Sequence, residues 1–500
     1  MLSLIVKHRQ LGFCVHSPEI DACIPSCDAR LRDFFHACNI TSFVQILERL
    51  TTRKWNFATK SGNITFFLLL YTMKIRVILI NFCILNVIFA ISTQMAIAQR
   101  PPKEEKLLNG LRVLMWSDES AAKVYVKLRI HAGASFDPQE KEGVMMLLSE
   151  AIFPNEEIRE FFRDELGGSL DVTTNYDYIE INASSKPDQY LTMLETLANA
   201  VTNPVIDKAT TEAVKSKLAA KLEVSEKNAF HVADLAVRKR LFETFPYGRP
   251  LGGNSTSLKR IDFADLKFAY DRLFGADNAT IAISGNFPTD VGYRAVRRYF
   301  GSWLKSDKKV PSTFRQPEPP PSAMQILQSP EPGITEMRYA VRGVARNDRD
   351  YAAASVLALI LEQRIKAKAP AEQRANVFVR NYSNILPGVL VFGISKIRTD
   401  LATAVTNEKP RGDASELLAA AMGAPLTDAE FNAAKAAVLA EHAKLEAPTL
   451  WLDADTFRLT SVKVDQDAFA NVSLAEVQRF ANRIKQQPIA SVLVLTPKSA

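Results

Sequence analysis

A proline-rich stretch, Pro311 to Pro321 (PSTFRQPEPPP), divides the larger, C-terminal part of this sequence into two halves. Proline has a fixed φ angle and no backbone N–H, so closely spaced prolines exclude a helix or an inner strand. On both sides of the stretch, β-type runs alternate with long helical patterns. We therefore expect two folded bodies of similar size, joined by an extended linker.

The two halves show the same order of predicted elements. In the first half, Asn109-Gly110 predicts a hairpin, Val124 to Ile130 alternates like a half-buried strand, and a helix begins at Glu142. In the second half a strand, a helix and a β-type run recur, and the chain closes on the strand ASVLVLTP. The predicted fold class is α+β, with two related domains of mixed β-sheet covered by long helices. Other expected segments are a β-type run over 171–183, a long helical pattern over 210–245, a strand over 335–344 and a helix over 350–367.

Charge and cysteine content both distinguish the first hundred residues from the rest. Ten of the 62 Lys and Arg, and five of the 55 Asp and Glu, lie in residues 1–98, so the body carries 52 basic and 50 acidic side chains. A nearly neutral body indicates no nucleic-acid partner. All five cysteines lie at or before Cys83, so the body has no thiolate nucleophile or disulfide. Cys23 and Cys27 are too irregularly placed relative to His36 and Cys38 to favour a zinc site.

Residues 73–98 have the three parts of a secretory signal peptide. Lys74 and Arg76 form a positive start, a fifteen-residue apolar run follows from Val77, and Ala96-Ile97-Ala98 resembles a cleavage site. We expect an exported protein, periplasmic or secreted, with no stable membrane insertion after cleavage. The alternative is an internal anchor over residues 64–91. The predicted organisation is a misassigned upstream region (1–72), a signal peptide (73–98), an N-terminal domain (99–310), a Pro-rich linker (311–322) and a C-terminal domain (323–500).

Four ordered motifs of the body carry a family resemblance. They read RIHAGASFDPQEKEGVMMLLSEAIF, LGGSLDVTTNYDYIEI, FPYGRPLGGNSTSLKRI and DNATIAISGNF. Together they resemble the pitrilysin/insulinase family of zinc peptidases, which includes mitochondrial processing peptidases and exported bacterial proteases. The resemblance covers almost the whole body from about residue 105 and implies a processing-peptidase-like metallohydrolase fold.

The resemblance places a zinc motif in the helix after Gly143, and that motif is altered. The family pattern is H-x-x-E-H, in which two histidines bind zinc and the glutamate is the general base. Anchored on Gly143 and Phe153, these positions are Met146, Ser149 and Glu150. A thioether is a poor zinc ligand, a serine cannot replace a carboxylate base, and one glutamate is no metal site.

Other candidate ligands do not restore the site. The family's third ligand is a glutamate on a later helix, and both Glu223 and Glu226 remain candidates for that position. The body histidines His131, His231 and His442 are far apart in the sequence and favour packing or surface roles. We therefore expect no catalytic residues, no bound metal and no cofactor.

The resemblance also implies a peptide-binding strand. The strand from Leu170 to Ile181 corresponds to the one that pairs with substrate in the family, and such pairing uses backbone groups. Asp171 and Val172 occupy positions where the family usually has Asn-Ala. Arg364 corresponds to a substrate-holding arginine, although the glycines and the tyrosine that accompany it in the family are changed. The predicted peptide-binding residues are Leu170, Asp171, Val172, Thr173, Thr174 and Arg364.

The leading hypothesis is an exported, catalytically inactive homologue that acts as the non-catalytic partner of a zinc-bearing subunit and contributes peptide-binding surface. Two alternatives stay open: an active zinc endopeptidase with a non-standard site, and a stand-alone envelope protein that binds peptides.

Overall fold

The computed structural model describes residues 101–306, 314, 317–397 and 419–495. The chain divides into two compact units, Met1–Gln94 and Met95–Ala500, and all described residues belong to the second. The predicted upstream region, the predicted signal peptide and part of the predicted linker therefore lie outside the described residues. The predicted domain boundaries stay a prediction.

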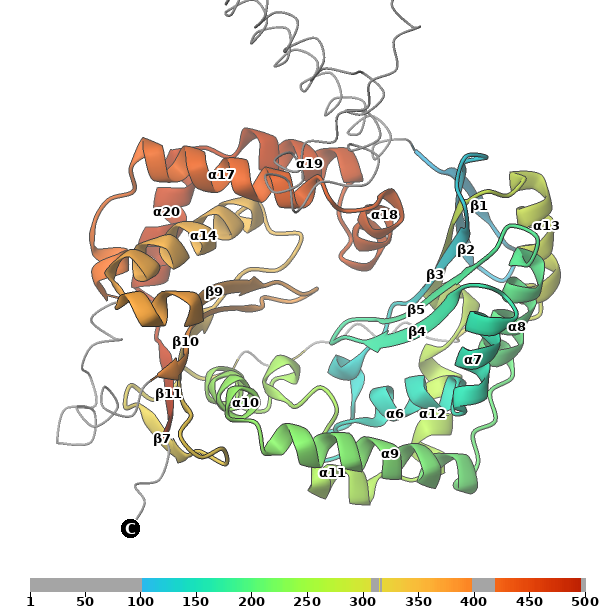
Figure 1. Ribbon diagram of the computed structural model, residues 1–500, viewed down its shortest axis with the longest axis horizontal. Helices are drawn as coiled ribbons and strands as arrows, with labels where there is room; N and C mark the ends of the chain where they lie inside the picture. The colour runs from blue at the N-terminus through green and yellow to red at the C-terminus, as the bar shows by residue number, and fades with distance from the viewer. Residues whose placement is uncertain (1–100, 307–313, 315–316, 398–418, 496–500) are drawn as a thin grey trace, which may run out of the picture. The chain divides into compact units, whose positions relative to one another are not determined.

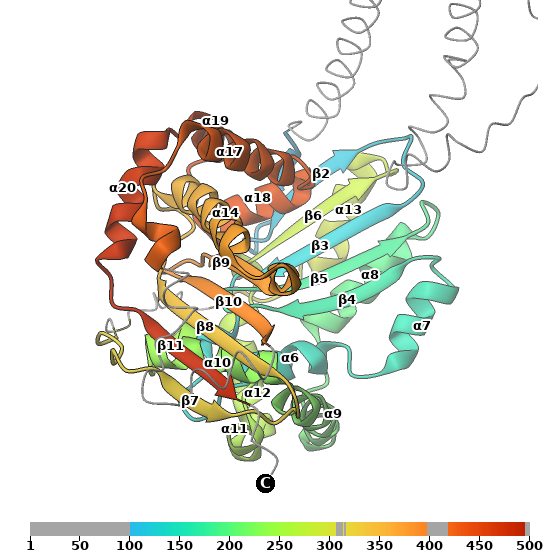
Figure 2. The same ribbon diagram turned by 60° about the vertical axis from the view of Figure 1, so that its left-hand side comes forward.

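The first half forms a six-stranded mixed sheet in the order β1-β2-β6-β3-β5-β4 (Figure 2). The pair β2–β6 is parallel and the other neighbours are antiparallel. Its strands are β1 (Lys103–Lys106), β2 (Arg112–Ser117), β3 (Val124–Ile130), β4 (Ser169–Thr174), β5 (Ile179–Ser185) and β6 (Ala279–Gly285). Its helices are α6 (Val144–Ile152), α7 (Glu156–Asp164), α8 (Tyr190–Thr202), α9 (Lys208–Glu226), α10 (Ala229–Phe242), α11 (Ser255–Arg260), α12 (Phe263–Leu273) and α13 (Thr289–Phe300).

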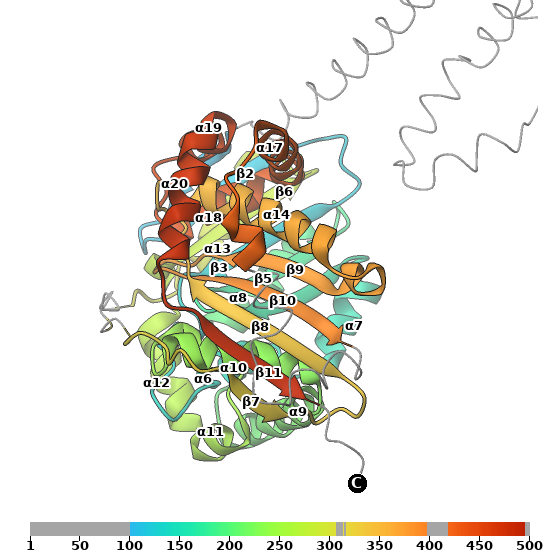
Figure 3. The same cartoon turned by 90° about the vertical axis from the view of Figure 1, so that its left-hand side faces the viewer.

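The second half forms a five-stranded sheet in the order β7-β11-β8-β10-β9, which faces the viewer in Figure 3. Here β11–β7 is the parallel pair. Its strands are β7 (Gln325–Gln328), β8 (Thr335–Arg342), β9 (Val377–Tyr382), β10 (Val389–Ile397) and β11 (Ala490–Leu495). Its helices are α14 (Tyr351–Lys368), α17 (Asp428–His442), α18 (Ala447–Thr456), α19 (Val462–Asn471) and α20 (Leu474–Lys485) (Figure 1).

The two sheets repeat one topology. In each, the strand that closes the half (β6 or β11) inserts beside an early strand in parallel, and an antiparallel meander follows. The strand order β2-β6-β3-β5-β4 of the first sheet corresponds to the order β7-β11-β8-β10-β9 of the second sheet. Strand β1 is an additional strand in the first sheet. The predicted fold class, with mixed sheets and many covering helices, is confirmed.

Helix α10 lies within the first half in sequence but packs on the second sheet. Its apolar residues Ala229, Ala233, Val237 and Leu241 recur every four positions, so they form one buried stripe on the helix. That stripe joins a hydrophobic cluster with residues of β8, β10 and β11, among them Ala340, Val391 and Val492. The two halves therefore share part of their core.

Helix α18 makes the reverse contact, from the second half to the first sheet. It lies against β6, where Trp451 meets Trp116 edge to face with ring centroids 6.5 Å apart. Asp453 accepts a 2.7 Å hydrogen bond from Arg129, and Asp455 lies 3.3 Å from Arg112. Both charged and apolar contacts thus join the halves.

Two expected segments are divided in the structure. The helical pattern over 210–245 is two helices, because the Asn228 side chain accepts the backbone N–H of His231 and starts α10. The β-type run after Leu170 is a hairpin, in which residues 175–178 turn between β4 and β5. None of the helices in the described part of the chain combines the length and hydrophobicity needed to cross a bilayer.

Candidate functional site

Helix α6 is positioned at its start by a buried carboxylate. Asp137 accepts the backbone N–H groups of Gly143 (2.7 Å) and Met145 (2.8 Å), which are free donors at a helix N-terminus. Burial raises the pKa of Asp137 to about 7, against the effect of these two donors. Gly143 has φ +107°, and a Cβ there would lie 2.7 Å from the Gly252 carbonyl oxygen. The turn therefore requires glycine, and it fixes where α6 begins.

The first two altered positions have ordinary packing roles. Met146 is half-buried against the core of the first half, and a Cβ on Gly252 would come within 2.9 Å of its sulfur. The Ser149 hydroxyl donates to the Met146 carbonyl oxygen (2.8 Å) and lies 2.7 Å from the Thr174 hydroxyl. Ser149 thus links α6 to the end of β4. It places a hydroxyl group at the position where the family pattern has the glutamate base.

The third altered position, Glu150, is surrounded by cations. Its carboxylate accepts a 3.0 Å hydrogen bond from Lys221 and lies 3.9 Å from Lys217, both on α9. Arg159 of α7 approaches to 3.9 Å. Ion pairs among protein side chains therefore occupy the place where the family pattern would put metal ligands.

The structure places neither candidate for the third ligand against Glu150. Glu223 is exposed and pairs with Lys227 at 2.8 Å, and Glu226 lies 3.4 Å from the Ser255 hydroxyl. The α9 residue that faces Glu150 most closely is Lys221. An ammonium group at this point repels a metal cation.

The residues of this site do not fit zinc. Among the described residues, no group of three or more His, Cys, Asp or Glu side chains is placed to hold a metal ion. His131 lies between the hydroxyls of Thr280 and Thr456, and His442 lies 3.4 Å from Asp465. Both histidines have partners away from α6, which agrees with the packing role that the sequence favoured. No step of a metal-dependent reaction can be assigned to His131, His442 or the three altered residues of α6.

Among the described residues, strand β4 is the last strand of the first sheet, and its outer edge pairs with no other strand. The Asn175 N–H bonds the Tyr178 carbonyl oxygen across the turn, so the register makes Thr173 and Asp171 hydrogen-bonded partners of β5. The N–H and C=O groups of the alternate residues then point away from β5, toward the edge. These outward residues are Leu170, Val172 and Thr174.

Side chains along β4 alternate between two environments. Asp171 and Thr173 are exposed, whereas Leu170 is buried and Val172 half-buried on the side of the helices. The predicted peptide-binding residues 170–174 thus all lie on one edge strand, beside α6. That these residues bind peptide stays a prediction. Strand β5 is paired with β3 and β4 on its two edges, so no peptide strand can add to it.

Arg364 has a different environment from the one predicted. Its Nε and Nη2 bond the Glu430 carboxylate at 2.6 and 2.8 Å, and its other donors reach the carbonyl oxygens of Ala421, Ala424 and Pro425. The hydrogen bond from Arg364 lowers the pKa of Glu430 to about 2. All five N–H donors are engaged, so Arg364 has none left for a peptide and holds α14 to the segment before α17.

Sequence reasoning missed two residues of this region. Lys217 and Lys221 stand four positions apart, a spacing that places both on one face of α9. That spacing is visible in the sequence. Their proximity to Glu150 is not, because 71 positions separate Glu150 from Lys221.

The altered motif lies on a short helix beside an edge strand, within one half of a repeated mixed-sheet fold. Solved structures share this fold. The peptidase M16 inactive domain from Pseudomonas fluorescens has a TM-score of 0.68 and 18% identity over 80% of this chain and 99% of its own. A protease from Helicobacter pylori has a TM-score of 0.67 and 15% identity over 79% and 100%.

Two family models match the sequence of this chain. Residues 112–255 match "Insulinase (Peptidase family M16)", and residues 260–438 match "Peptidase M16 inactive domain". Together the two matches cover more than half of the chain. The chain belongs to the insulinase (M16) peptidase family, as its four motifs predicted.

Curated relatives are similar at low identity over part of the chain. An uncharacterized zinc protease of Rickettsia felis is 22% identical over 41% of this chain and 50% of its own length. A probable beta subunit of the mitochondrial-processing peptidase from Arabidopsis thaliana is 24% identical over 51% and 49%. The chain spans half or less of the length of these relatives.

Proposed function

We propose that this chain is a non-catalytic, peptide-binding subunit that works beside a zinc-bearing homologue. The observation that carries the proposal is the Glu150–Lys221 ion pair, which joins the two helices at the point where the family pattern requires metal ligands. Because the Lys221 ammonium already balances the charge of the Glu150 carboxylate, this carboxylate does not require a metal cation as a counter-charge. The similarity to processing-peptidase beta subunits supports a paired arrangement in general.

The peptide-binding part of the proposal rests on β4. An extended peptide that adds to a free sheet edge pairs with backbone N–H and C=O groups and needs no catalytic side chain. Leu170, Val172 and Thr174 offer such groups toward the edge. Peptide binding can therefore outlast the loss of the zinc ligands.

We also propose that the protein is exported and works in the periplasm or outside the cell. The support is the signal-peptide pattern of residues 73–98, with its positive start, apolar run and A-x-A end. Fractionation of cells that produce the full chain tests this proposal. Recovery of the uncleaved protein in the cytoplasm would contradict it.

Co-purification tests the paired arrangement. The tagged chain is produced together with a homologue from the same organism that keeps H-x-x-E-H, and the mixture is assayed for cleavage of unfolded peptides. We expect a complex in which activity depends on the homologue's glutamate base and not on Ser149. A chain that purifies alone and binds peptide would instead support the stand-alone envelope protein, and zinc-dependent cleavage by the chain alone would support an active enzyme.

A proline substitution tests the edge strand. Val172→Pro removes an N–H that points outward while leaving the β4–β5 hydrogen bonds in place, since proline is tolerated at an outward edge position. We expect peptide binding to fall about tenfold, equivalent to about 1.4 kcal/mol. Val172→Ala is the matched control, because it shortens the same side chain and keeps the N–H. Equal peptide affinity of Val172→Pro and Val172→Ala would rule out pairing at this edge.

A further inference from the structure

Three cations lie together beside the end of β4 that contacts α6. We call Arg159, Lys217 and Lys221 the basic cluster. It is linked to β4 through two neighbouring residues of α6: Glu150 contacts all three cations, and Ser149 lies 2.7 Å from the Thr174 hydroxyl. Figure 1 shows α6 near both β4 and α9. A ligand at this end of the strand therefore lies close to the cluster.

The cluster carries more positive charge than its acidic neighbours neutralise. Glu150 hydrogen-bonds Lys221 alone, since Lys217 and Arg159 both stand 3.9 Å from its carboxylate. Glu156 lies 3.5 Å from Arg159, which accounts for one further cation. The remaining excess lies on the lysines, whose side chains are 42% and 55% exposed. Glu223, on the same helix, is paired with Lys227 instead.

The charges on β4 itself do not alter this balance. Asp171 is exposed on the face of the sheet opposite to Leu170 and Val172, because side chains alternate along a strand. A peptide paired with β4 also presents alternate side chains to the two faces. Those on the helical face point toward α6 and the lysines of α9.

We infer that the peptide bound along β4 carries an acidic side chain on its helical face, and that Lys217 and Lys221 recognise this carboxylate. The inference rests on the proposed peptide-binding function and names its substrate class. The loss of the zinc ligands thus has a second consequence, because a cation-binding site has become an anion-binding one. The lysines select among peptides, whereas the backbone of β4 binds them.

Two labelled peptides of equal length test the inference by fluorescence anisotropy with the full chain. Every second residue is Thr in both, and the residues between are Glu in one and Gln in the other, so in each register the helical face receives either Thr from both peptides or Glu from one and Gln from the other. We expect the Glu peptide to bind about three- to tenfold more tightly, as two partly exposed ion pairs allow. This preference is expected to shrink at 1 M salt, where the screening length falls to about 3 Å.

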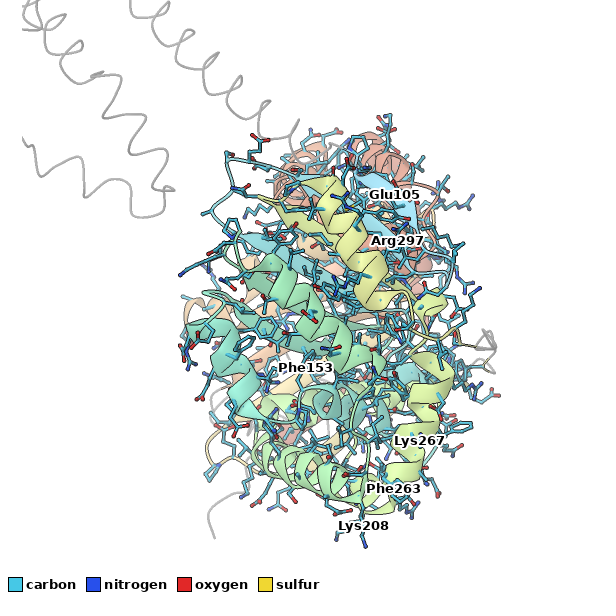
Figure 4. All side chains as sticks on the ribbon, turned by 90° about the vertical axis from the view of Figure 1, so that its right-hand side faces the viewer. Glu105, Phe153, Lys208, Phe263, Lys267 and Arg297 are labelled. Carbon is cyan, nitrogen blue, oxygen red and sulfur yellow. The ribbon has the colours of Figure 1, made fainter. Side chains whose placement is uncertain are left out.

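The double variant Lys217→Gln/Lys221→Gln is expected to abolish the preference and leave the affinity for the Gln peptide unchanged. Lys208→Gln is the matched control, since Lys208 begins the same helix and lies on the outer surface (Figure 4). Equal binding of the two peptides by the unmodified chain, or a preference that survives in the double variant, would overturn the inference. Val172→Pro separates the two proposals, because it is expected to weaken both peptides alike. If neither peptide binds the unmodified chain, both proposals fail.

Discussion

At the scale of single residues, the altered zinc positions form a consistent set. Glu150 and Lys221 carry opposite charges and pair across α6 and α9 at 3.0 Å. Met146 is half-buried against the core and Ser149 bonds Thr174. Each of these three side chains has a partner of suitable chemistry in the surrounding structure.

Restoring the three motif residues is therefore expected to be insufficient for zinc binding. In the variant Met146→His/Ser149→Glu/Glu150→His, the Lys221 ammonium stays beside position 150 and repels the ion. Adding Lys221→Glu is expected to give about one zinc per chain, because three protein ligands then converge. Metal analysis after dialysis measures the difference.

The matched control adds Glu to α9 at a position that faces away. The triple variant combined with Lys208→Glu carries the same net charge as the four-residue variant and is expected to stay free of zinc. Stoichiometric zinc in the triple variant alone would show that Lys221 does not repel the ion.

At the scale of elements, ion pairs fix the positions of helices of the second half relative to one another. Asp465 of α19 accepts two hydrogen bonds from Arg346, at 2.6 and 2.7 Å, and lies 3.4 Å from His442 of α17. The His442 ring also packs on Phe469 with centroids 4.6 Å apart. One carboxylate thus joins three segments of the fold.

This carboxylate predicts a pH dependence of stability. Burial alone would raise the pKa of Asp465, but the hydrogen bonds from Arg346 and the nearby His442 ring outweigh burial and lower it to about 2, from 3.8. Because the pKa in the folded state is depressed, the stabilisation is complete above about pH 4 and is lost as the pH falls toward 2. We expect Asp465→Asn to lower the free energy of unfolding by about 2 kcal/mol at pH 5 and by much less near pH 2.

Urea unfolding of the unmodified chain and of Asp465→Asn, followed from pH 5 to pH 2, measures this difference. Asp467→Asn is the control, because its partner Lys463 is 81% exposed and such surface pairs contribute little. A destabilisation by Asp465→Asn that does not change with pH would contradict the depressed pKa.

At the scale of the whole described molecule, the two halves exchange helices. Helix α10 packs on the second sheet and α18 on the first, so neither half has a complete core without the other. The outer helices differ from these two: α12 exposes Phe263 and Lys267 on the surface seen in Figure 4. Separating the two halves is therefore expected to expose buried apolar surface on both sheets.

Arg129 is the charged centre of the contact between α18 and the first sheet. Its side chain is 2% exposed, bonds Glu180 and Asp453, and lies 4.0 Å from the centre of the Tyr178 ring. Arg129→Met keeps much of the volume but leaves the buried Glu180 carboxylate and the partly buried Asp453 carboxylate without this cation. We expect a loss of about 3–5 kcal/mol of unfolding free energy, measured by urea denaturation.

The exposed pair Lys463–Asp467 again supplies the comparison, since Lys463→Met is expected to change stability by less than about 0.5 kcal/mol. The combined variant Arg129→Met/Glu180→Gln/Asp453→Asn is expected to recover part of the loss, because it removes the unpaired charges as well. A loss below about 1 kcal/mol for Arg129→Met would mean that water reaches the two carboxylates.

The sequence by itself determined the family, the fold class and the residues that stand at the positions of the H-x-x-E-H pattern. These follow from local patterns: turn glycines such as Gly143, alternating strands such as Val124 to Ile130, and three residues within one turn of α6. Local patterns can be recognised in a sequence because residues close in sequence lie on the same helix face or in the same strand. Such patterns do not predict which residue of α9 faces α6.

Only the tertiary structure decided which side chains surround the altered motif. Lys221 meets Glu150, Arg364 gives all its donors to the segment before α17, and α10 leaves its own half for the second sheet. Each of these contacts joins residues far apart in the sequence, or depends on which of several similar apolar or charged faces is buried. Their specificity comes from packing and charge pairing across elements, and no spacing within a single element encodes it.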